Sequence, residues 1–130
     1  MANRTISVSV VIPVYNCETT IKKTIDSVLA QDNLDFEVII VDDGSTDRSA
    51  EIITKYEDAR IRYFYQENSG ISSALNYGIS QSNAEFIARI DGDDVALPNR
   101  LKVQYEILKR NIRVCLVGTA VDYINSQGVI

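Results

Sequence analysis

Three acidic residues, Asp91, Asp93 and Asp94, lie within four consecutive positions directly after a mostly apolar run. Two carboxylates about 5 Å apart repel each other by roughly 3 kcal/mol at an effective dielectric constant near 20. Such a group either raises the pKa values of its own members or recruits a cation. Ligand sets made of oxygen alone select Mg²⁺ or Mn²⁺, which commonly bridge one or two carboxylates to the phosphates of a substrate. The spacing therefore indicates diphosphate binding through a divalent cation, with a solvated loop as the alternative.

Two other polar segments, Pro13–Asn16 and Asp42–Ser45, also directly follow apolar runs. If all three segments follow parallel strands, they face one crevice, because ligands of open parallel sheets bind beyond the carboxyl ends of the strands. Gly92 lacks a Cβ atom, so the chain can turn sharply there and a ligand can approach closely. Alone, Asp42–Ser45 could be a turn that caps a helix, and Tyr15 could be a packing residue. The three segments together favour a binding site.

Two hydrophobic periodicities alternate along the chain and predict the elements that carry these segments. Runs rich in β-branched and apolar residues predict strands. Apolar residues at helical spacing predict amphipathic helices. The predicted strands cover residues 7–15, 36–43, 61–66, 85–91 and 113–124. The predicted helices cover residues 18–31, 45–56, 72–80 and 99–111.

Short polar residues are predicted to cap the first two helices. Asn16 is expected at the start of the first helix, and Ser45 or Thr46 at the start of the second. Strand and helix alternate with connections too short for anything but crossover units. The predicted fold is therefore α/β, with a mostly parallel sheet flanked by helices.

The bulk composition limits the classes of function. The chain has 130 residues, enough for one domain with one core, and its 45% of hydrophobic residues is ordinary for a globular protein. The net charge of −5 argues against nucleic-acid binding, which needs a basic surface. The sequence contains no histidine, which excludes a Ser-His-Asp triad and a histidine-ligated zinc site. Any chemistry must depend on carboxylates, hydroxyls, lysine, arginine or a metal ion.

The two cysteines, Cys17 and Cys115, lie far apart and have no metal-ligand spacing. They are predicted to be buried free thiols of a reducing compartment. No signal peptide precedes the first predicted strand, and no apolar run reaches membrane-spanning length. A cytoplasmic location is expected, with contact to the inner membrane surface only through segments outside this sequence.

Four motifs occur in order along the chain: PVYN at 13–16, VDDGSTD at 41–47, NSGISSALNYG at 68–78, and IDGDD at 90–94 followed by PNRL. In order and spacing they closely resemble the inverting nucleotide-sugar glycosyltransferases of family 2, which have the Rossmann-like GT-A fold. The resemblance extends from Ser7 to the end of the chain. It implies an enzyme that transfers a sugar from a nucleotide-diphosphate donor, most often a UDP-sugar, to a hydroxyl acceptor with the help of Mn²⁺ or Mg²⁺.

The resemblance also implies roles for individual residues. Tyr15 would pack on the nucleotide base, with the backbone of Pro13 and Val14 beside it. Asp43 would accept a hydrogen bond from the uracil ring N–H. The first acid of the Asp-x-Asp motif, Asp91, would contact the ribose. These assignments place the nucleoside across the ends of the first, second and fourth predicted strands.

The second acid of the motif, Asp93, is implied as the metal ligand that bridges to the diphosphate. Asp94 stands where the family often has an acid, and Asp42 is expected to support the turn. Asn76 is a further supporting residue in the third motif. Gly92 would let the nucleotide sugar approach the backbone.

The third motif departs from the family at one position. The family often has an arginine directly before the asparagine, and this chain has Leu75. Lys22, Lys23 and Arg89 are the possible sources of positive charge for the diphosphate. The two lysines fit a solvated helix face better.

The family's general base, an Asp or Glu well downstream of the Asp-x-Asp motif, has no counterpart in the last thirteen residues. Asp122 is a remote alternative. Residues 1–130 are therefore expected to be the N-terminal nucleotide-sugar-binding portion of a longer GT-A domain. The base is expected beyond Ile130, and the acceptor would be a saccharide, lipid-linked or protein hydroxyl.

Two other functions fit parts of the sequence. Phosphatases that form an aspartyl-phosphate with Mg²⁺ also carry Asp-x-Asp after a strand. They usually carry it on the first strand, whereas Asp91 follows the fourth. A non-catalytic module that only binds a nucleotide or a protein partner is the other alternative.

Overall fold

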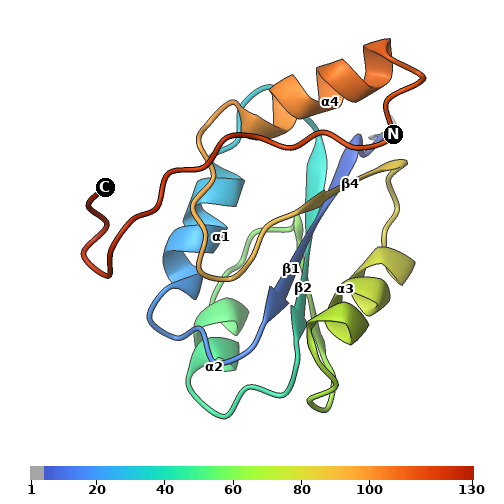
Figure 1. The fold of residues 1–130 in the computed structure, drawn as a ribbon. Coiled ribbons are helices and arrows are strands. Elements are labelled where there is room, and N and C mark those ends of the chain that lie inside the picture. The colour runs from blue at the N-terminus through green and yellow to red at the C-terminus, as the bar shows by residue number, and fades with distance from the viewer. Residues whose placement is uncertain (1–4) are drawn as a thin grey trace.

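The computed structural model describes residues 5–130. Strands and helices alternate along this part of the chain (Figure 1). The strands are β1 (Val8–Val14), β2 (Phe36–Asp42), β3 (Ile61–Tyr65) and β4 (Phe86–Arg89). The helices are α1 (Ile21–Leu29), α2 (Ser49–Thr54), α3 (Ile71–Ser80) and α4 (Arg100–Arg110). These eight elements confirm the predicted alternation, with bounds that differ from the predicted ones by a few residues.

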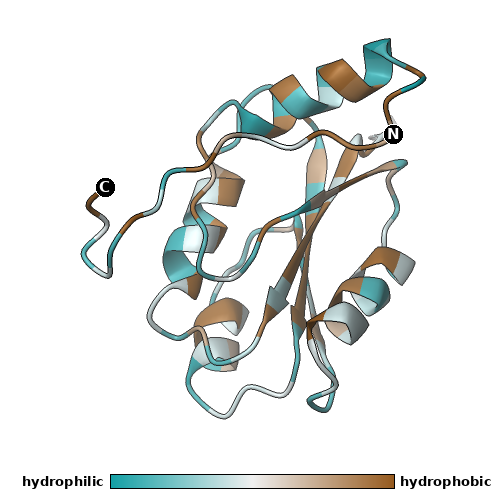
Figure 2. Ribbon diagram, in the orientation of Figure 1, coloured by the Kyte–Doolittle hydropathy of each residue, from teal (hydrophilic) through white to brown (hydrophobic). Residues whose placement is uncertain are grey.

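The four strands form one parallel sheet in the order β3-β2-β1-β4. All residues of β1 and β2 are buried, as expected for strands covered on both faces. Figure 2 shows both strands as largely apolar, whereas the helices carry apolar and hydrophilic residues on different sides. The predicted α/β architecture is therefore confirmed.

Alternate side chains of β1 enter two cores on opposite faces of the sheet. Val10 and Ile12 pack in the larger core, together with Ile25 of α1. Val11 points to the other face, where it packs with Ala74 of α3. Figure 1 shows the same division, with α1 and α2 on one face and α3 on the other. The order of the strands changes direction at β1, so the carboxyl ends of β1 and β4 form a switch point where α/β sheets bind ligands.

The loop after β1 and the loop after β2 are joined by reciprocal hydrogen bonds, which differ from the predicted caps. The backbone N–H of Asn16 donates to Ser45 Oγ at 3.0 Å, and Asn16 Oδ1 accepts from the backbone N–H of Thr46 at 2.8 Å. Helix α1 begins only at Ile21, with Thr20 in the capping position. The predicted caps were wrong because each side chain bonds to the neighbouring loop instead of to its own helix.

The prediction of a fifth strand at 113–124 was wrong. This segment has no strand in the structure, and its side chains are mostly exposed, with Leu116 at 88% and Tyr123 at 89%. β-branched residues favour a strand only where a partner strand and a packing surface are available. Cys115 is exposed as well, which contradicts its predicted burial, whereas Cys17 is half-buried; both thiols are free. Within residues 5–130, no helix is long and apolar enough to cross a bilayer.

Candidate functional site

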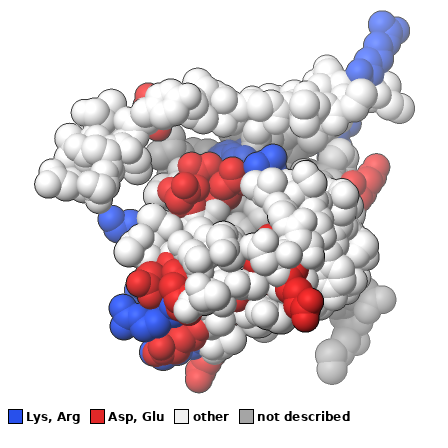
Figure 3. All heavy atoms as spheres, turned by 60° about the horizontal axis from the view of Figure 1, so that its bottom comes forward, with Lys and Arg blue, Asp and Glu red and all other residues white. Residues whose placement is uncertain are grey.

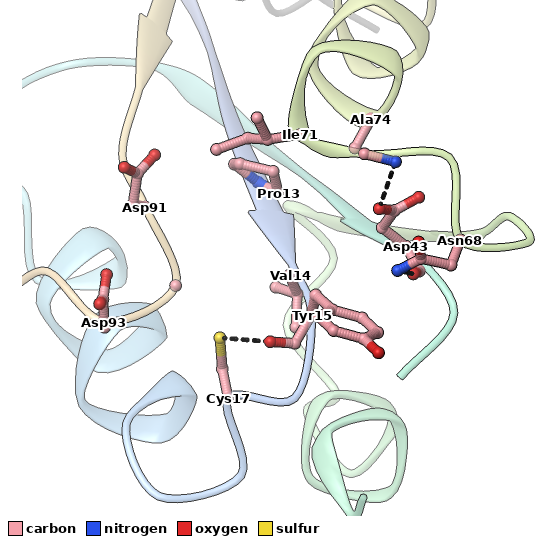
Figure 4. Close-up of a pocket in the computed structure, with 12 residues that line it drawn as sticks. Pro13, Val14, Tyr15, Cys17, Asp43, Asn68, Ile71, Ala74, Asp91 and Asp93 are labelled. Carbon is pink, nitrogen blue, oxygen red and sulfur yellow. Dashed lines mark hydrogen bonds between the residues drawn. The ribbon is translucent and has the colours of Figure 1, made fainter. Parts of the chain in front are cut away.

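A pocket of about 380 Å³ lies at the carboxyl ends of β1, β2 and β4 (Figure 4). Seven of the predicted site residues line it: Pro13, Val14, Tyr15, Asp43, Asp91, Gly92 and Asp93. Figure 4 shows the end of β1 between two acidic groups, with Asp43 on one side and Asp91 and Asp93 on the other. The parallel sheet thus brings residues separated by up to eighty positions into one cavity.

Asp43 is a buried carboxylate at the N-terminal end of α3. Its Oδ1 accepts hydrogen bonds from Gln66 Nε2 at 2.6 Å and the Ser69 N–H at 2.8 Å, and its Oδ2 accepts from the Gly70 N–H at 2.9 Å. Burial raises the pKa of Asp43, but these hydrogen bonds outweigh burial, and the net pKa is lowered. The carboxylate is therefore ionised at neutral pH, and its position is fixed by the start of α3.

Asp91 forms an ion pair with Arg89, the last residue of β4. Arg89 Nε donates to Asp91 Oδ1 at 2.9 Å, and Arg89 Nη2 donates to Asp91 Oδ2 at 3.2 Å. Both carboxylate oxygens thus have a partner in a bidentate arrangement. The pair is partly exposed, so its net contribution to folding stability is small.

Asp93 differs from the other two acids of the pocket. It is exposed and makes no hydrogen bond or ion pair with any residue in the described range 5–130. The turn before it is tight, because a Cβ atom on Gly92 would lie 3.1 Å from Cys17 Sγ and 3.4 Å from the Pro13 carbonyl oxygen. The Gly92 carbonyl accepts a hydrogen bond from Thr20 Oγ1 at 3.0 Å. The turn is thus fixed to the rest of the protein while the carboxylate of Asp93 stays available to a ligand.

Residues 9–129 match the family model described as glycosyl transferase family 2. The chain belongs to glycosyltransferase family 2. Its curated relatives include an uncharacterized glycosyltransferase of Rickettsia typhi, 44% identical over 103 residues, and glycosyltransferase GlyG of Streptococcus pneumoniae, 35% identical over 124 residues. The matches cover 79% and 93% of this chain but only 32% and 41% of those relatives. The chain therefore spans less than half the length of these two proteins.

Solved glycosyltransferase structures share the fold. Residues 1–349 of S. aureus TarS in complex with UDP-GlcNAc match with a TM-score of 0.76 and 31% identity, over 81% of this chain and 32% of that one. The mannosyltransferase PcManGT of Pyrobaculum calidifontis in complex with GDP-Man and Mn²⁺ matches with a TM-score of 0.66 and 25% identity, over 78% of this chain and 31% of that one. The sheet and flanking helices of this family-2 chain are thus those of the GT-A fold.

Three of the predicted supporting residues of this family-2 chain do not line the pocket. Asp42 is fully buried, accepts hydrogen bonds from the Ser45 N–H at 2.8 Å and Tyr63 Oη at 2.9 Å, and so stabilises the turn after β2. Asp94 is largely exposed beside the pocket, and partial desolvation together with the negative charges of Asp93 and Asp91 raises its pKa. Asn76 is exposed on α3.

Five residues that line the pocket were not among the predicted site residues: Cys17, Asn68, Gly70, Ile71 and Ala74. Four of them belong to the NSGISSALNYG motif, from which the sequence analysis selected only Asn76. The loop before α3 crosses to the end of β2, where Asn68 Nδ2 donates to the Asp43 carbonyl at 3.1 Å. A side chain at Gly44 would lie 2.8 Å from the Asn68 backbone nitrogen, and the φ angle of Gly44 is +79°. This close approach explains the glycine at position 44. The contact between the two loops depends on where β2 ends in space and could not be read from their sequences.

The donor chemistry of the pocket fits Mg²⁺ or Mn²⁺ that arrives with phosphate ligands. The pocket offers carboxylates and no histidine, and residues 5–130 contain no group of three or more His, Cys, Asp or Glu residues that could hold a metal ion alone. Figure 3 shows the face with the carboxyl ends of the strands, where acidic side chains gather directly beside basic ones. Asp93 is the residue that would hold the ion, because it is the pocket carboxylate that has no hydrogen-bond or ion-pair partner among residues 5–130.

Proposed function

We propose that this chain is the donor-binding part of a metal-dependent, inverting glycosyltransferase that uses a UDP-sugar. The observation that carries the proposal is that Asp43 and Asp93, at the ends of different strands, open onto the same pocket. Family membership supports sugar transfer, and the TarS structure supports the nucleotide, because that protein is 31% identical and is in complex with UDP-GlcNAc.

The nucleoside would lie across the end of β1. Tyr15 is half-exposed at the pocket and offers a ring face to a base. Asp43 is ionised, and its Oδ2 accepts one hydrogen bond from the protein, so a further donor such as the uracil N–H can be accommodated. Asp91, fixed by Arg89, would accept hydrogen bonds from the ribose hydroxyls.

The diphosphate would lie next to Asp93. When bound there, Mg²⁺ or Mn²⁺ supplies Lewis-acid stabilisation of the leaving diphosphate. Asp93 would hold the ion, and Gly92 would let the phosphates approach the backbone. The acceptor hydroxyl would attack the anomeric carbon from the opposite face, after losing its proton to a base. We place that base outside residues 1–130, because the chain spans less than half the length of two of its relatives.

The phosphatase alternative is disfavoured by the geometry of Asp91. An aspartyl-phosphate enzyme needs the first acid of its motif as a free nucleophile. Both oxygens of Asp91 are instead occupied by Arg89, and the motif follows the last strand of the sheet. A role in binding alone is compatible with residues 1–130 taken by themselves. The four motifs of a transferase family, present in order, support a catalytic full-length protein.

Isothermal titration calorimetry with UDP tests the proposal. UDP is expected to bind the parent chain in the presence of Mn²⁺ and to lose at least tenfold in affinity when EDTA replaces the ion. Asp93→Ala should bind UDP weakly with or without Mn²⁺, since it lacks the carboxylate that links ion and protein. Asp32→Asn, an exposed change on another surface, serves as the control. The proposal is wrong if Asp93→Ala binds UDP as tightly as the parent chain and with the same Mn²⁺ requirement. The choice of nucleotide is wrong if the parent chain binds GDP more tightly than UDP.

A further inference from the structure

The Arg89–Asp91 ion pair divides the acids of the pocket into two kinds. Both carboxylate oxygens of Asp91 and of Asp43 accept hydrogen bonds from the protein, whereas those of Asp93 accept none within the described part of the chain. The guanidinium of Arg89 is held by the two oxygens of Asp91, and the backbone carbonyl of Arg89 accepts a hydrogen bond from Arg100 Nη2 at 2.8 Å. Asp91 is therefore a preorganised acceptor for hydroxyl groups and a poor ligand for a cation.

The charges around the acidic turn are nearly balanced. Asp91, Asp93 and Asp94 are accompanied by Arg89, which pairs with Asp91, and by Arg100, whose charge acts on Asp94. One negative charge is left over, and a single free carboxylate with water ligands binds Mg²⁺ or Mn²⁺ weakly. Tight binding requires further oxygen ligands, and the diphosphate of the donor can provide them.

We propose that Arg89 is a positioning residue that keeps Asp91 away from the metal ion, so that the divalent cation binds tightly only together with the diphosphate. The inference rests on the proposed function, because it assumes the same ion at Asp93. Arg89 also keeps the two acids of the motif in separate roles, Asp91 for hydroxyls and Asp93 for the cation.

Binding of Mn²⁺ alone, without nucleotide, tests this role directly. The signal of free Mn²⁺ in electron paramagnetic resonance gives the affinity for the parent chain and for Arg89→Gln. The variant is expected to bind Mn²⁺ about tenfold more tightly, because it lacks a nearby positive charge that repels the divalent ion. The freed oxygens of Asp91 act in the same direction. Arg110→Gln, which breaks an exposed ion pair on α4, is the matched control and should leave the affinity unchanged.

Two double variants show whether the gain arises at this pair. Arg89→Gln with Asp91→Asn has the same net charge as the parent, and its Mn²⁺ affinity should return to the parent range. Arg89→Gln with Asp93→Asn should lose the gain, because the proposed ligand is absent. Should Arg89→Gln fail to fold in a thermal melt, Arg89→Lys replaces it. One ammonium group cannot form the bidentate pair with both oxygens of Asp91. This variant should therefore bind Mn²⁺ roughly two- to threefold more tightly than the parent chain.

The outcomes separate this inference from the proposed function. Unchanged or weaker Mn²⁺ binding by Arg89→Gln overturns the role of Arg89, even if UDP binding depends on Mn²⁺ and Asp93 as proposed. A gain that persists without Asp93 also overturns it, since the ion then binds elsewhere. Failure of the parent chain to bind UDP contradicts the proposed function and leaves the Mn²⁺ comparison to decide the Arg89 inference by itself.

Discussion

At the scale of single residues, the role of each acid near the pocket is set by its partners. Asp42 is buried and accepts hydrogen bonds from the Ser45 N–H and from Tyr63 Oη, so it stabilises the turn after β2. Asp43 is bonded to the start of α3 and still borders the cavity. Asp91 is paired with Arg89, and Asp93 has no partner among the residues that the structure describes. Four identical side chains therefore have four different environments, and the contacts that create these environments are visible only in the structure.

Replacing Asp43 by Asn should destabilise the protein in a pH-dependent way. An amide cannot accept hydrogen bonds on both terminal atoms, so either the Gly70 N–H or the Ser69 N–H loses its acceptor, at a cost of about 1–3 kcal/mol. The pKa of Asp43 is lowered in the folded protein, and an unfolded Asp has a pKa near 3.9. The stabilisation by Asp43 is hence complete above that value and is lost as the pH falls through the folded-state pKa.

Urea unfolding at several pH values measures this difference. The gap in unfolding free energy between parent and Asp43→Asn should be largest above about pH 5 and should shrink towards pH 3. Asp32→Asn, an exposed Asp, should show no such gap. A gap that stays constant down to pH 3 would mean that the loss does not come from the ionised carboxylate.

At the scale of elements, α1 fixes the loop that carries the acidic motif. Thr20 Oγ1 donates to the Gly92 carbonyl, Ser27 Oγ accepts from the Ala96 N–H at 3.0 Å, and Gln31 Oε1 accepts from the Leu101 N–H at 3.0 Å. Ser27 belongs to α1, and Thr20 and Gln31 lie just outside its two ends, so the three contacts follow the loop from the site to α4. The loop between β4 and α4 is therefore a supported part of the fold, although it has no regular secondary structure.

Sequence patterns predicted the elements much better than the contacts between them. The β-branched runs around Val10 and Val38 place β1 and β2 correctly, because burial on both faces leaves a continuous apolar signal. The pairing of Asn16 with the Ser45 loop was missed, since it depends on two strand ends meeting in space. Arg89 was considered only as a phosphate ligand, and its pairing with Asp91 required the geometry of β4.

Gly78→Ala tests how closely α3 must approach the sheet. A Cβ atom at this position would lie 2.5 Å from Val11 Cγ1 and 3.2 Å from Val41 Cγ2. Alanine favours a helix by about 1 kcal/mol over glycine, but overpacking of the core costs about 1–3 kcal/mol, and we expect a net loss of stability. The displaced α3 would also shift Gly70 and weaken UDP binding several-fold.

Chemical unfolding and calorimetry of a double-mutant cycle check this expectation. Val11→Ala removes the methyl group that the new Cβ would meet, so the loss in the double variant should be smaller than the sum of the two single losses. Strict additivity would show that the loss does not come from contact with Val11, and a gain in stability from Gly78→Ala alone would show that α3 can move away without cost.

At the scale of the whole molecule, the carboxyl and amino ends of the parallel strands differ in the role of their polar residues. The carboxyl ends carry the pocket, whereas the amino ends carry the buried Glu37, which accepts from Ser9 Oγ at 2.6 Å, Arg62 Nη1 at 3.0 Å and the Asn83 N–H at 2.8 Å. Burial raises the pKa of Glu37, but these donors outweigh it and the net pKa is lowered. This network joins three strands to the connection between α3 and β4, so the sheet is stabilised far from the residues that would bind the donor.

The arrangement predicts that the last segment of the chain is dispensable for donor binding. All residues that line the pocket lie between positions 13 and 93, and the segment after Asn111 contacts the rest of the fold through few hydrogen bonds, such as that from Gln104 Nε2 to the Val117 carbonyl. A chain ending at Asn111 should keep a melting temperature within about 3 °C of the parent, since exposed side chains contribute little to stability.

Removing residues 112–130 should also reduce self-association, because the segment exposes large apolar side chains such as Ile112 and Leu116. Sedimentation velocity over a range of concentrations measures association, and calorimetry with UDP and Mn²⁺ measures binding, expected within twofold of the parent. A tenfold loss of UDP affinity in the shortened chain, with its cooperative melt intact, would show that the segment reaches the pocket in solution. The pocket would then depend on more of the molecule than the ends of the parallel strands.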